Sequence, residues 1–414
     1  LVNEKVDLCV ECGFCEPVCP SRDLTFTPRN RISIAREIKI MENNSDQRRL
    51  DLIKAYNYQG TDTCAVDGLC ETACPVNINT GNFIKELRFD AHSPLQNRIA
   101  DWTVNHFVGL QKFIRVLLDL QQLAKYFGLH FLLGKPMQMI NKWTNHVIPA
   151  WNSKLPAGAR VRSQEVYGSG KPHVYYTSCI NRTFNATGKK ASLTDIIGQI
   201  AAICDIQLIV PERVDETCCG TPYSSKGFKA AYTKMVARTI TMLYEASRQG
   251  ELPIIVDTSP CTYQFKTMGD FITDGQILAM WKKMKFVDII PFLNDLIIER
   301  DEKSLDSEVV LHPTCSTQKM DQVDLMVNLA RKCARTVYLP EDYGCCAFAG
   351  DRGMLIPELT ASATRKEAEQ VRQLPVTVRG ISTSRTCEVG MMSSSDRAYE
   401  SIALLVRDYL TQVK

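Results

Sequence analysis

Four cysteines near the start of the chain have the spacing of an iron–sulfur site. Cys9, Cys12, Cys15 and Cys19 follow one another closely, and Pro20 comes next. In this arrangement, which is typical of bacterial ferredoxins, three thiolates hold three irons of a four-iron cube and the fourth binds a second cluster. A zinc site is the weaker alternative, because zinc sites more often use two Cys-x2-Cys pairs with a longer insert between them.

A second run with the same spacing begins at Cys64. An aspartate, Asp67, stands where the second cysteine of this run is expected, and Pro75 again closes the run. Because the fourth ligand of each run belongs to the other cluster, the runs predict two [4Fe-4S] clusters. The two predicted ligand groups are Cys9, Cys12, Cys15 and Cys74, and Cys19, Cys64, Asp67 and Cys70.

The aspartate leaves the second cluster open to three interpretations. Its carboxylate binds the fourth iron, or that position is vacant and the site alternates between [3Fe-4S] and [4Fe-4S], or Asp67 is a solvated turn residue beside Gly68. A hard oxygen ligand suits an iron–sulfur cluster less well than a thiolate does. The first two interpretations therefore predict that one iron of this cluster is labile.

The C-terminal half contains an internal duplication of cysteine-bearing segments. The four matching cysteines are Cys179, Cys218, Cys219 and Cys261 in the first copy, and Cys315, Cys345, Cys346 and Cys387 in the second. Four thiols are enough for one metal centre per copy, an iron–sulfur cluster or another metal. Adjacent cysteines cannot both face one small centre without strain, so three thiols would bind the metal and the fourth would be a supporting neighbour of the centre. Thiols that only pack as small apolar groups are the alternative.

Each copy alternates expected strands with expected helices, which predicts a parallel sheet whose ligands lie at the carboxyl ends of strands. The expected strands are 173–179, 206–210, 254–258, 309–315, 336–339 and 380–384. The expected helices include 228–248, 286–298, 361–372 and 397–409. Cys204 and Cys333 are interpreted as core residues, and His312 as a polar residue at a strand end.

The remaining segments are expected to be helical. Helix patterns at 31–41 and 46–56, in the long insert between the two runs, indicate an all-α ferredoxin-like domain of the kind found in succinate dehydrogenase-type subunits. Residues 93–165 lack cysteine and carry a net charge of +6, from nine Lys and Arg and three Asp and Glu. The overall prediction is an α/β protein with four parts: 1–92, a helical linker at 93–170, and cysteine-rich modules at 171–300 and 301–414.

Composition excludes several classes of protein. The chain has 414 residues, of which 45% are hydrophobic and 23% charged, so it is not disordered. A net charge of +3 gives no support for a nucleic-acid partner. The longest mostly apolar stretch, 107–133, is interrupted by charges, which argues against a transmembrane helix. We expect a cytoplasmic protein in which the basic stretch 93–165 packs on the cluster domains and presents its Lys and Arg side chains to solvent. The alternative is peripheral contact with the inner face of the membrane through Lys112, Arg115 and Lys125.

Three stretches resemble the C-terminal iron–sulfur half of bacterial FAD-linked D-lactate dehydrogenases: CVECGFCEPVCPSRDLTFTPRNRISIAR, TDTCAVDGLCETACPVNINTG with its aspartate, and GCCAFAGDRGMLIPELTASATRKEAEQV. The resemblance implies an oxidoreductase in which a preceding FAD domain, not in this chain, oxidises the hydroxy acid. This part would then relay electrons to a quinone or cytochrome. The sequence starts at Leu1 without Met or a signal peptide, and we interpret it as the C-terminal part of a longer polypeptide or a shortened form.

The duplicated cysteines also resemble the CCG domain of three other families: heterodisulfide reductases, glycolate oxidase iron–sulfur subunits and anaerobic glycerol-3-phosphate dehydrogenase subunits. The pattern departs from that domain at Gln264 and Gly390, where a further cysteine is usual, and at Ala347, where the second copy reads Cys-Cys-Ala. A separate iron–sulfur subunit of one of those complexes is the first alternative function. A metal-stabilised interaction module without redox chemistry is the second.

Overall fold

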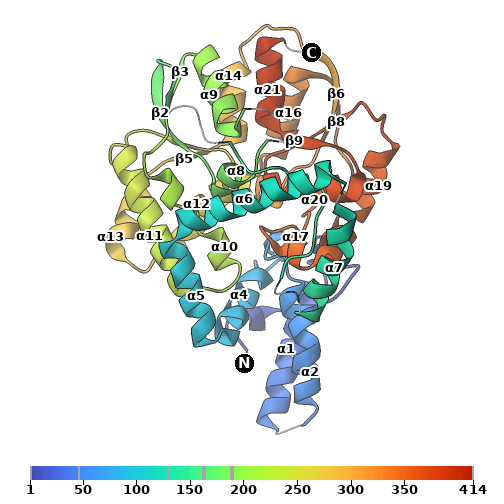
Figure 1. Ribbon diagram of the computed structural model, residues 1–414. Coiled ribbons are helices and arrows are strands. Elements are labelled where there is room, and N and C mark those ends of the chain that lie inside the picture. Colours follow the sequence, from blue (N-terminus) through green and yellow to red (C-terminus); the bar gives the residue numbers. More distant parts are fainter. Residues whose placement is uncertain are drawn as a thin grey trace.

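A computed structural model describes residues 2–44, 47–128, 130–144, 146, 148–160, 165–186 and 191–412. The N-terminal part is helical, as predicted. Thr27 caps α1 (Pro28–Asn43) through a capping box with Asn30, and Pro28 favours the first helical turn. With α2 (Arg49–Tyr56), α1 forms a hairpin that projects from the body (Figure 1). Asp46, the expected start of the second helix, lies outside the described residues.

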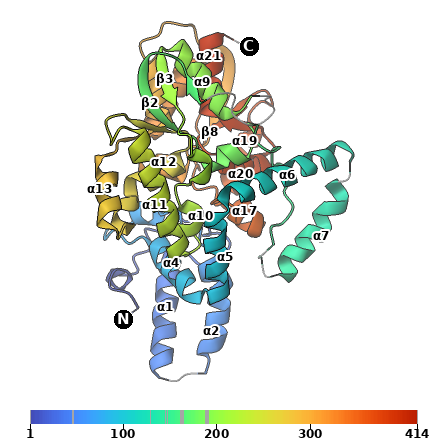
Figure 2. The ribbon, with the colours of Figure 1, turned by 60° about the vertical axis from the view of Figure 1, so that its left-hand side comes forward.

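A π-helical turn (Asn57–Asp62), α3 (Leu69–Thr72) and α4 (Thr80–Ala91) complete the N-terminal part. Three helices follow: α5 (Pro94–Asn105), α6 (Phe107–Tyr126) and α7 (His130–Trp143). Figure 1 shows α6 crossing the front of the body, and in the turned view of Figure 2 α6 runs outward to α7, which stands away from the body. The predicted helical character of 93–165 therefore holds as far as Trp143, and residues 148–160 are not helical. None of the described helices is both long and apolar enough to span a membrane.

The first duplicated copy is a five-stranded sheet of order β1-β3-β2-β4-β5. Strands β2 (Lys171–Tyr176), β3 (Ile206–Ile209), β4 (Ile254–Val256) and β5 (Phe286–Asp288) are parallel, whereas β1 (Val166–Tyr167) pairs antiparallel with β3. The helices are α8 (Cys179–Thr183), α9 (Leu193–Ile203), α10 (Thr221–Ser224), α11 (Lys229–Ala246), α12 (Ser259–Thr267), α13 (Gly275–Lys283) and α14 (Ile289–Ile297).

The second copy is a four-stranded parallel sheet of order β7-β6-β8-β9. Its strands are β6 (Leu305–Leu311), β7 (Ala334–Tyr338), β8 (Arg379–Ser382) and β9 (Tyr399–Ser401). Its helices are α15 (Cys315–Lys319), α16 (Val323–Cys333), α17 (Arg352–Leu355), α18 (Pro357–Ala363), α19 (Arg365–Gln373), α20 (Arg385–Ser395) and α21 (Ile402–Thr411). This strand order repeats the order β3-β2-β4-β5 of the first copy, so the duplication extends to topology.

Four sequence-based element predictions were wrong in part. The expected helices 286–298 and 397–409 each begin with a short strand, β5 and β9, because three residues at the sheet edge pair with the neighbouring strand. The expected helix 361–372 is interrupted between α18 and α19 at Thr364. The expected linker before residue 171 contains β1, which extends the first sheet by one strand.

The two copies share one apolar core, which includes residues of α9 and α14 from the first copy and of α16 and α21 from the second. Helix α9 contacts α21, and the equivalent pair α14 and α16 also makes contact. In the same way α12 contacts α15, and α8 contacts α20. Each of these helix contacts therefore occurs twice, with the first and second copies interchanged, as in an isologous interface with two-fold symmetry.

Candidate iron–sulfur and thiol sites

The first predicted ligand group lines one cavity. Residues Cys9, Cys12, Cys15 and Cys74 surround it together with Arg29 and backbone from both runs. Cys12 is exposed, and the other three thiols are partly buried. Exposed apolar side chains flank this loop, namely Leu8, Val10, Phe14 and Val76. The crossed pairing of the two runs thus brings the four thiols to a site at the molecular surface.

The second predicted group lines another cavity, formed by Cys19, Cys64, Asp67 and Cys70 with Arg31 and Thr80. All three cysteines are buried here, in contrast to the first cavity. Burial raises the pKa of Cys70 to about 12 and that of Cys15, in the first cavity, to about 11. These two groups are therefore thiols, and not free thiolates, until a cation is bound.

A buried arginine connects the thiols of the second cavity. The Arg31 side chain is 1% exposed and donates to the Gly60 carbonyl oxygen at 2.7 Å, to Ser21 Oγ at 2.9 Å and to Cys19 Sγ at 3.6 Å. Burial opposes its charge, but the Cys64 and Cys19 thiols hold the pKa of Arg31 above its usual range. A fixed positive charge beside the sulfurs stabilises an anionic thiolate centre. The sequence analysis missed this residue.

Asp67 has features of two of the three interpretations. Its Oδ1 accepts a hydrogen bond from the Leu69 N–H at 2.8 Å, as in a turn residue preceding α3. The same carboxyl group lines the second cavity beside three thiols. Burial raises the pKa of Asp67, with the Leu69 N–H acting in the opposite direction. The structure therefore places the carboxylate at the cavity and not in bulk solvent.

Lys319 joins the second cavity to both cysteine-rich copies. Its Nζ donates to the Asp67 carbonyl oxygen at 3.3 Å and lies 4.0 Å from the ring centroid of Tyr263 in α12. Gly68 has φ +78°, a conformation that favours glycine, and a Cβ at this residue would come within 2.5 Å of this Nζ, so the lysine would have to shift. The negative charge of Asp67 also disfavours the thiolate forms of Cys315 and Cys345.

In the first copy the four cysteines form two thiol pairs in contact. Cys179 Sγ lies 3.4 Å from Cys218 Sγ, and Cys219 Sγ lies 3.3 Å from Cys261 Sγ. Hydrogen bonding with Cys218 and Cys261 lowers the pKa of Cys219 well below its usual range. Cys179 follows β2 and Cys261 follows β4. The chain adds β3 on one side of β2 and then β4 on the other side. Parallel sheets bind ligands at the carboxyl ends of the two strands where the order changes side in this way.

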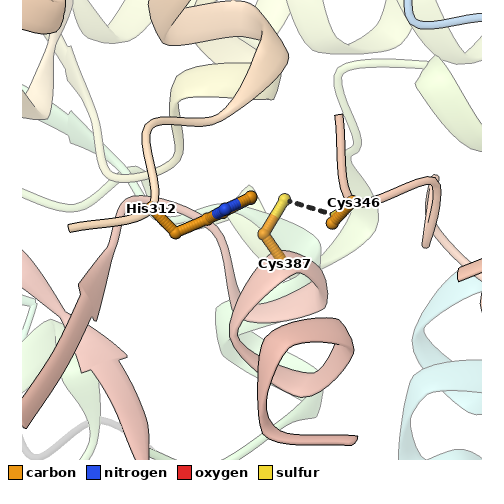
Figure 3. Close-up of side chains that lie close together, drawn as sticks. All are labelled: His312, Cys346 and Cys387. Carbon is orange, nitrogen blue, oxygen red and sulfur yellow. Dashed lines mark hydrogen bonds between the residues drawn. The ribbon is translucent and has the colours of Figure 1, made fainter. Parts of the chain in front are cut away.

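The second copy repeats this arrangement with one addition. Cys345 hydrogen-bonds with Cys315, and Cys346 Sγ lies 3.1 Å from Cys387 Sγ. His312, predicted as a polar strand-end residue, follows β6 but is completely buried beside Cys346 and Cys387 (Figure 3). Its position three residues before Cys315 was the signal in the sequence. Cys333 is buried in the shared core and Cys204 packs against it, as the core interpretation expects.

Comparisons with known proteins agree with the predicted chemistry. The family model described as 4Fe-4S dicluster domain matches residues 5–78, and the model described as cysteine-rich domain matches residues 173–266. The chain therefore carries an iron–sulfur dicluster domain and a cysteine-rich CCG domain, both within an α/β protein.

Three relatives extend the similarity. Lactate utilization protein A 1 of Bacillus mycoides (strain KBAB4) is 20% identical over 38% of this chain and 66% of its own length. The glycolate oxidase iron–sulfur subunit of Escherichia coli (strain K12) is 21% identical over 85% of this chain and 81% of its own. A probable glycolate oxidase iron–sulfur subunit of Bacillus subtilis (strain 168) is 26% identical over 56% of this chain and 52% of its own.

Proposed function

We propose that this chain is the iron–sulfur electron-transfer part of an FAD-dependent D-2-hydroxyacid dehydrogenase, with D-lactate as the substrate of the flavin partner. The observation that best supports this proposal is that the sites are neighbours. Asp67 lines the second cavity, Lys319 of the second copy hydrogen-bonds to it, and both lie near the Cys315 thiol. Iron–sulfur clusters, when bound, take up and release single electrons with little structural change. One relative is named a lactate utilization protein and the other two are named glycolate oxidase iron–sulfur subunits, one of them as probable, and these names support a role of this class.

The residues of the two cavities fit such cofactors. Each cavity offers four donor side chains, and in the second one Arg31 supplies a compensating charge. We assign Cys9, Cys12, Cys15 and Cys74 to one [4Fe-4S] cluster, and Cys19, Cys64, Cys70 and Asp67 to the other. The exposed Cys12 loop with its apolar border is the proposed contact for the FAD-binding partner, since it brings a cavity to the surface.

Metal analysis tests this assignment. Protein purified without oxygen is expected to contain about eight irons in the dicluster domain, and dithionite is expected to bleach its visible absorption reversibly. Cys9→Ser and Cys64→Ser should each remove one cluster and leave the other. A dicluster domain that contains only zinc, or a colour that dithionite does not bleach, would refute the electron-transfer role and favour the interaction module.

The substrate can be tested with the flavoprotein partner present. D-lactate is expected to bleach the clusters in the complex faster than glycolate at equal concentration. Faster bleaching by glycolate would instead assign the chain to a glycolate oxidase-type complex, and bleaching by glycerol 3-phosphate to the corresponding dehydrogenase. Transfer to a quinone analogue and to cytochrome c is compared in the same assay, because either acceptor accounts for the proposed relay.

We also propose that α6 contacts the membrane that holds the acceptor. One face of α6 packs on the body through Phe107, Gln111 and Leu118. The opposite face exposes a continuous apolar stripe, formed by Phe113, Val116, Leu117, Leu120, Leu123 and Phe127. Exposed lysines of α6 and α7, Lys112, Lys135 and Lys142, provide charge for anionic lipid, at about 1 kcal/mol each near the surface.

The structure changes which residues should carry this contact. Lys125, expected to face lipid, donates to the Leu155 carbonyl oxygen at 3.1 Å, and Arg115 is partly buried. The apolar stripe is therefore the better target than the charges first considered. Phe113/Leu117/Leu120→Gln is expected to abolish flotation with phosphatidylglycerol vesicles, whereas Lys125→Gln should float as the wild type does. Equal flotation of the triple variant, or none by the wild type at low salt, would refute the contact.

A further inference from the structure

The two cysteine-rich copies differ at the residue three positions before their first cysteine. This residue is Tyr176 in the first copy and His312 in the second, and both are completely buried. Neither the Tyr176 hydroxyl nor His312 Nε2 has an oxygen or nitrogen hydrogen-bond partner among the described residues, and the polar side chain that His312 meets on this side is the Cys346 thiol. A buried polar atom without a partner is costly, and it commonly marks a site that binds something. An imidazole nitrogen is a good metal ligand, whereas a protonated phenol is not.

In the second copy this nitrogen faces two thiols. His312, Cys346 and Cys387 each offer one ligand atom, and these atoms all lie within 4.8 Å of one another (Figure 3). All three residues are buried. We propose that His312, Cys346 and Cys387 together bind a single divalent metal ion of the zinc class, with a fourth donor completing a tetrahedron. No corresponding nitrogen donor stands at Tyr176, so the first copy lacks this site.

Glu367 of α19 prepares the histidine for this role. His312 Nδ1 and Glu367 Oε1 are 2.8 Å apart, and Glu367 is itself buried. The carboxylate accepts a hydrogen bond from Nδ1–H, and this contact turns Nε2 toward the thiols. A carboxylate behind a metal-binding histidine fixes both its tautomer and its ring orientation. Glu367 is therefore a positioning residue.

The geometry suits one ion and not a cube. Zinc binds sulfur and nitrogen at about 2.0 to 2.3 Å, so its ligand atoms gather around one point. An iron–sulfur cube instead takes one thiolate at each iron. On binding, both thiols and the His312 imidazolium each release one proton to solvent, and the two thiolates balance the charge of the ion. The inference refines the metal centre proposed for the second copy, and it does not depend on the electron relay.

Metal content and X-ray absorption at the zinc edge test the site in the full chain. The wild type is expected to hold about one zinc with both sulfur and nitrogen neighbours. His312→Ala should lose at least tenfold in zinc affinity in a chelator competition. His312→Cys should retain zinc with the nitrogen neighbour replaced by sulfur. Glu367→Gln should weaken affinity about 10- to 100-fold without changing the neighbours.

Two matched controls separate the site from general effects. Tyr176→Phe alters the equivalent position of the first copy, and Cys333→Ala removes a buried thiol elsewhere in the second. Both should leave the zinc content unchanged. A folding defect in His312→Ala would show as a lower urea midpoint. In that case the test relies on His312→Cys, which should still bind zinc but without the nitrogen neighbour.

Several results would overturn the inference. They are unchanged zinc affinity in His312→Ala, a zinc spectrum without nitrogen, loss of about four irons and not one ion, or a Cys346–Cys387 disulfide in place of metal. Iron in the dicluster domain is measured in the same samples. If that iron is absent while zinc is present at His312, the proposed function fails and this inference stands. If that iron is present while zinc is absent at His312, this inference fails and the proposed function stands.

Discussion

The two ferredoxin-type cavities come from runs of equal spacing, yet they provide different environments. The first lies at the surface, with Cys12 exposed and Val10 74% exposed beside it. The second has three buried cysteines, a buried arginine and an aspartate in place of one thiol. Spacing therefore specifies which donors converge, whereas the surrounding elements determine charge, access and the neighbouring site.

This difference gives the two cavities different roles. A partner protein can reach the first, and its apolar border offers contact area. The second is enclosed by α1, the π-helical turn and the second cysteine-rich copy. The buried Arg31 and the nearby Lys319 offset negative charge there, which favours the more reduced state of any cluster in the second cavity.

The largest expected effect is a difference in lost stability and lost iron between substitutions of two arginines of α1, Arg31 and Arg29. Arg31→Met removes a buried cation and leaves the Gly60 carbonyl and Cys19 without a donor, which should cost about 3 to 5 kcal/mol and the second cluster. Arg29→Met is the matched control, because Arg29 lines the first cavity, is 40% exposed and pairs with Glu16 at 2.9 Å. Such an exposed pair contributes about 0 to 1 kcal/mol. Urea unfolding and iron analysis measure both, and equal losses in the two variants would contradict the contrast.

Exchanging the second ligand position of the two runs should exchange their iron lability. Asp67→Cys is expected to remove the [3Fe-4S] signal from oxidised protein, because thiolate holds the fourth iron better than carboxylate does. Cys12→Asp should create such a signal in the first cavity. Electron paramagnetic resonance after controlled oxidation reports both changes. Identical spectra for wild type and Asp67→Cys would show that Asp67 is not an iron ligand.

Access to the two cavities should differ even when both carry four cysteines. In Asp67→Cys protein, an anaerobic iron chelator is expected to remove the iron of the first cavity several-fold faster than that of the second. The reason is that Cys12 is exposed, whereas Cys19, Cys64 and Cys70 are buried. Iron release over time, followed by the chelate absorbance, measures the two phases. A single phase would mean that both cavities open together.

The smallest expected effect concerns Lys319. Lys319→Met removes a cation–π contact with Tyr263 and should destabilise the protein by about 0.5 to 1 kcal/mol. It should also lower the reduction potential of the second cluster, because a positive charge near Asp67 is lost. Lys229→Met is the control, since Lys229 Nζ lies at the same 4.0 Å from the Phe89 ring and lines neither cavity. Redox titration should shift in Lys319→Met alone.

The sequence predicted what depends on short-range pattern and missed what depends on burial. The grouping of Cys9 with Cys74, and the parallel sheets of the two copies, followed from spacing and from alternating strands and helices. Strands β5 and β9 were missed because three residues give no periodicity to detect. Arg31 and His312 were missed because their importance arises from neighbours distant in sequence, Gly60 in one case and Cys346 and Cys387 in the other.

Because the two cysteine-rich copies share one apolar seam, we expect them to fold as one cooperative unit. Because α9 rests on α21 and α14 on α16, a chain cut between Ile297 and Leu305 would leave each half with an exposed apolar surface prone to aggregation. The two copies differ at a strand end, where Tyr176 and His312 stand at equivalent positions, whereas both copies contribute apolar side chains along the seam. In hydrogen exchange, amides of α9 and α21 should open together in the slowest class.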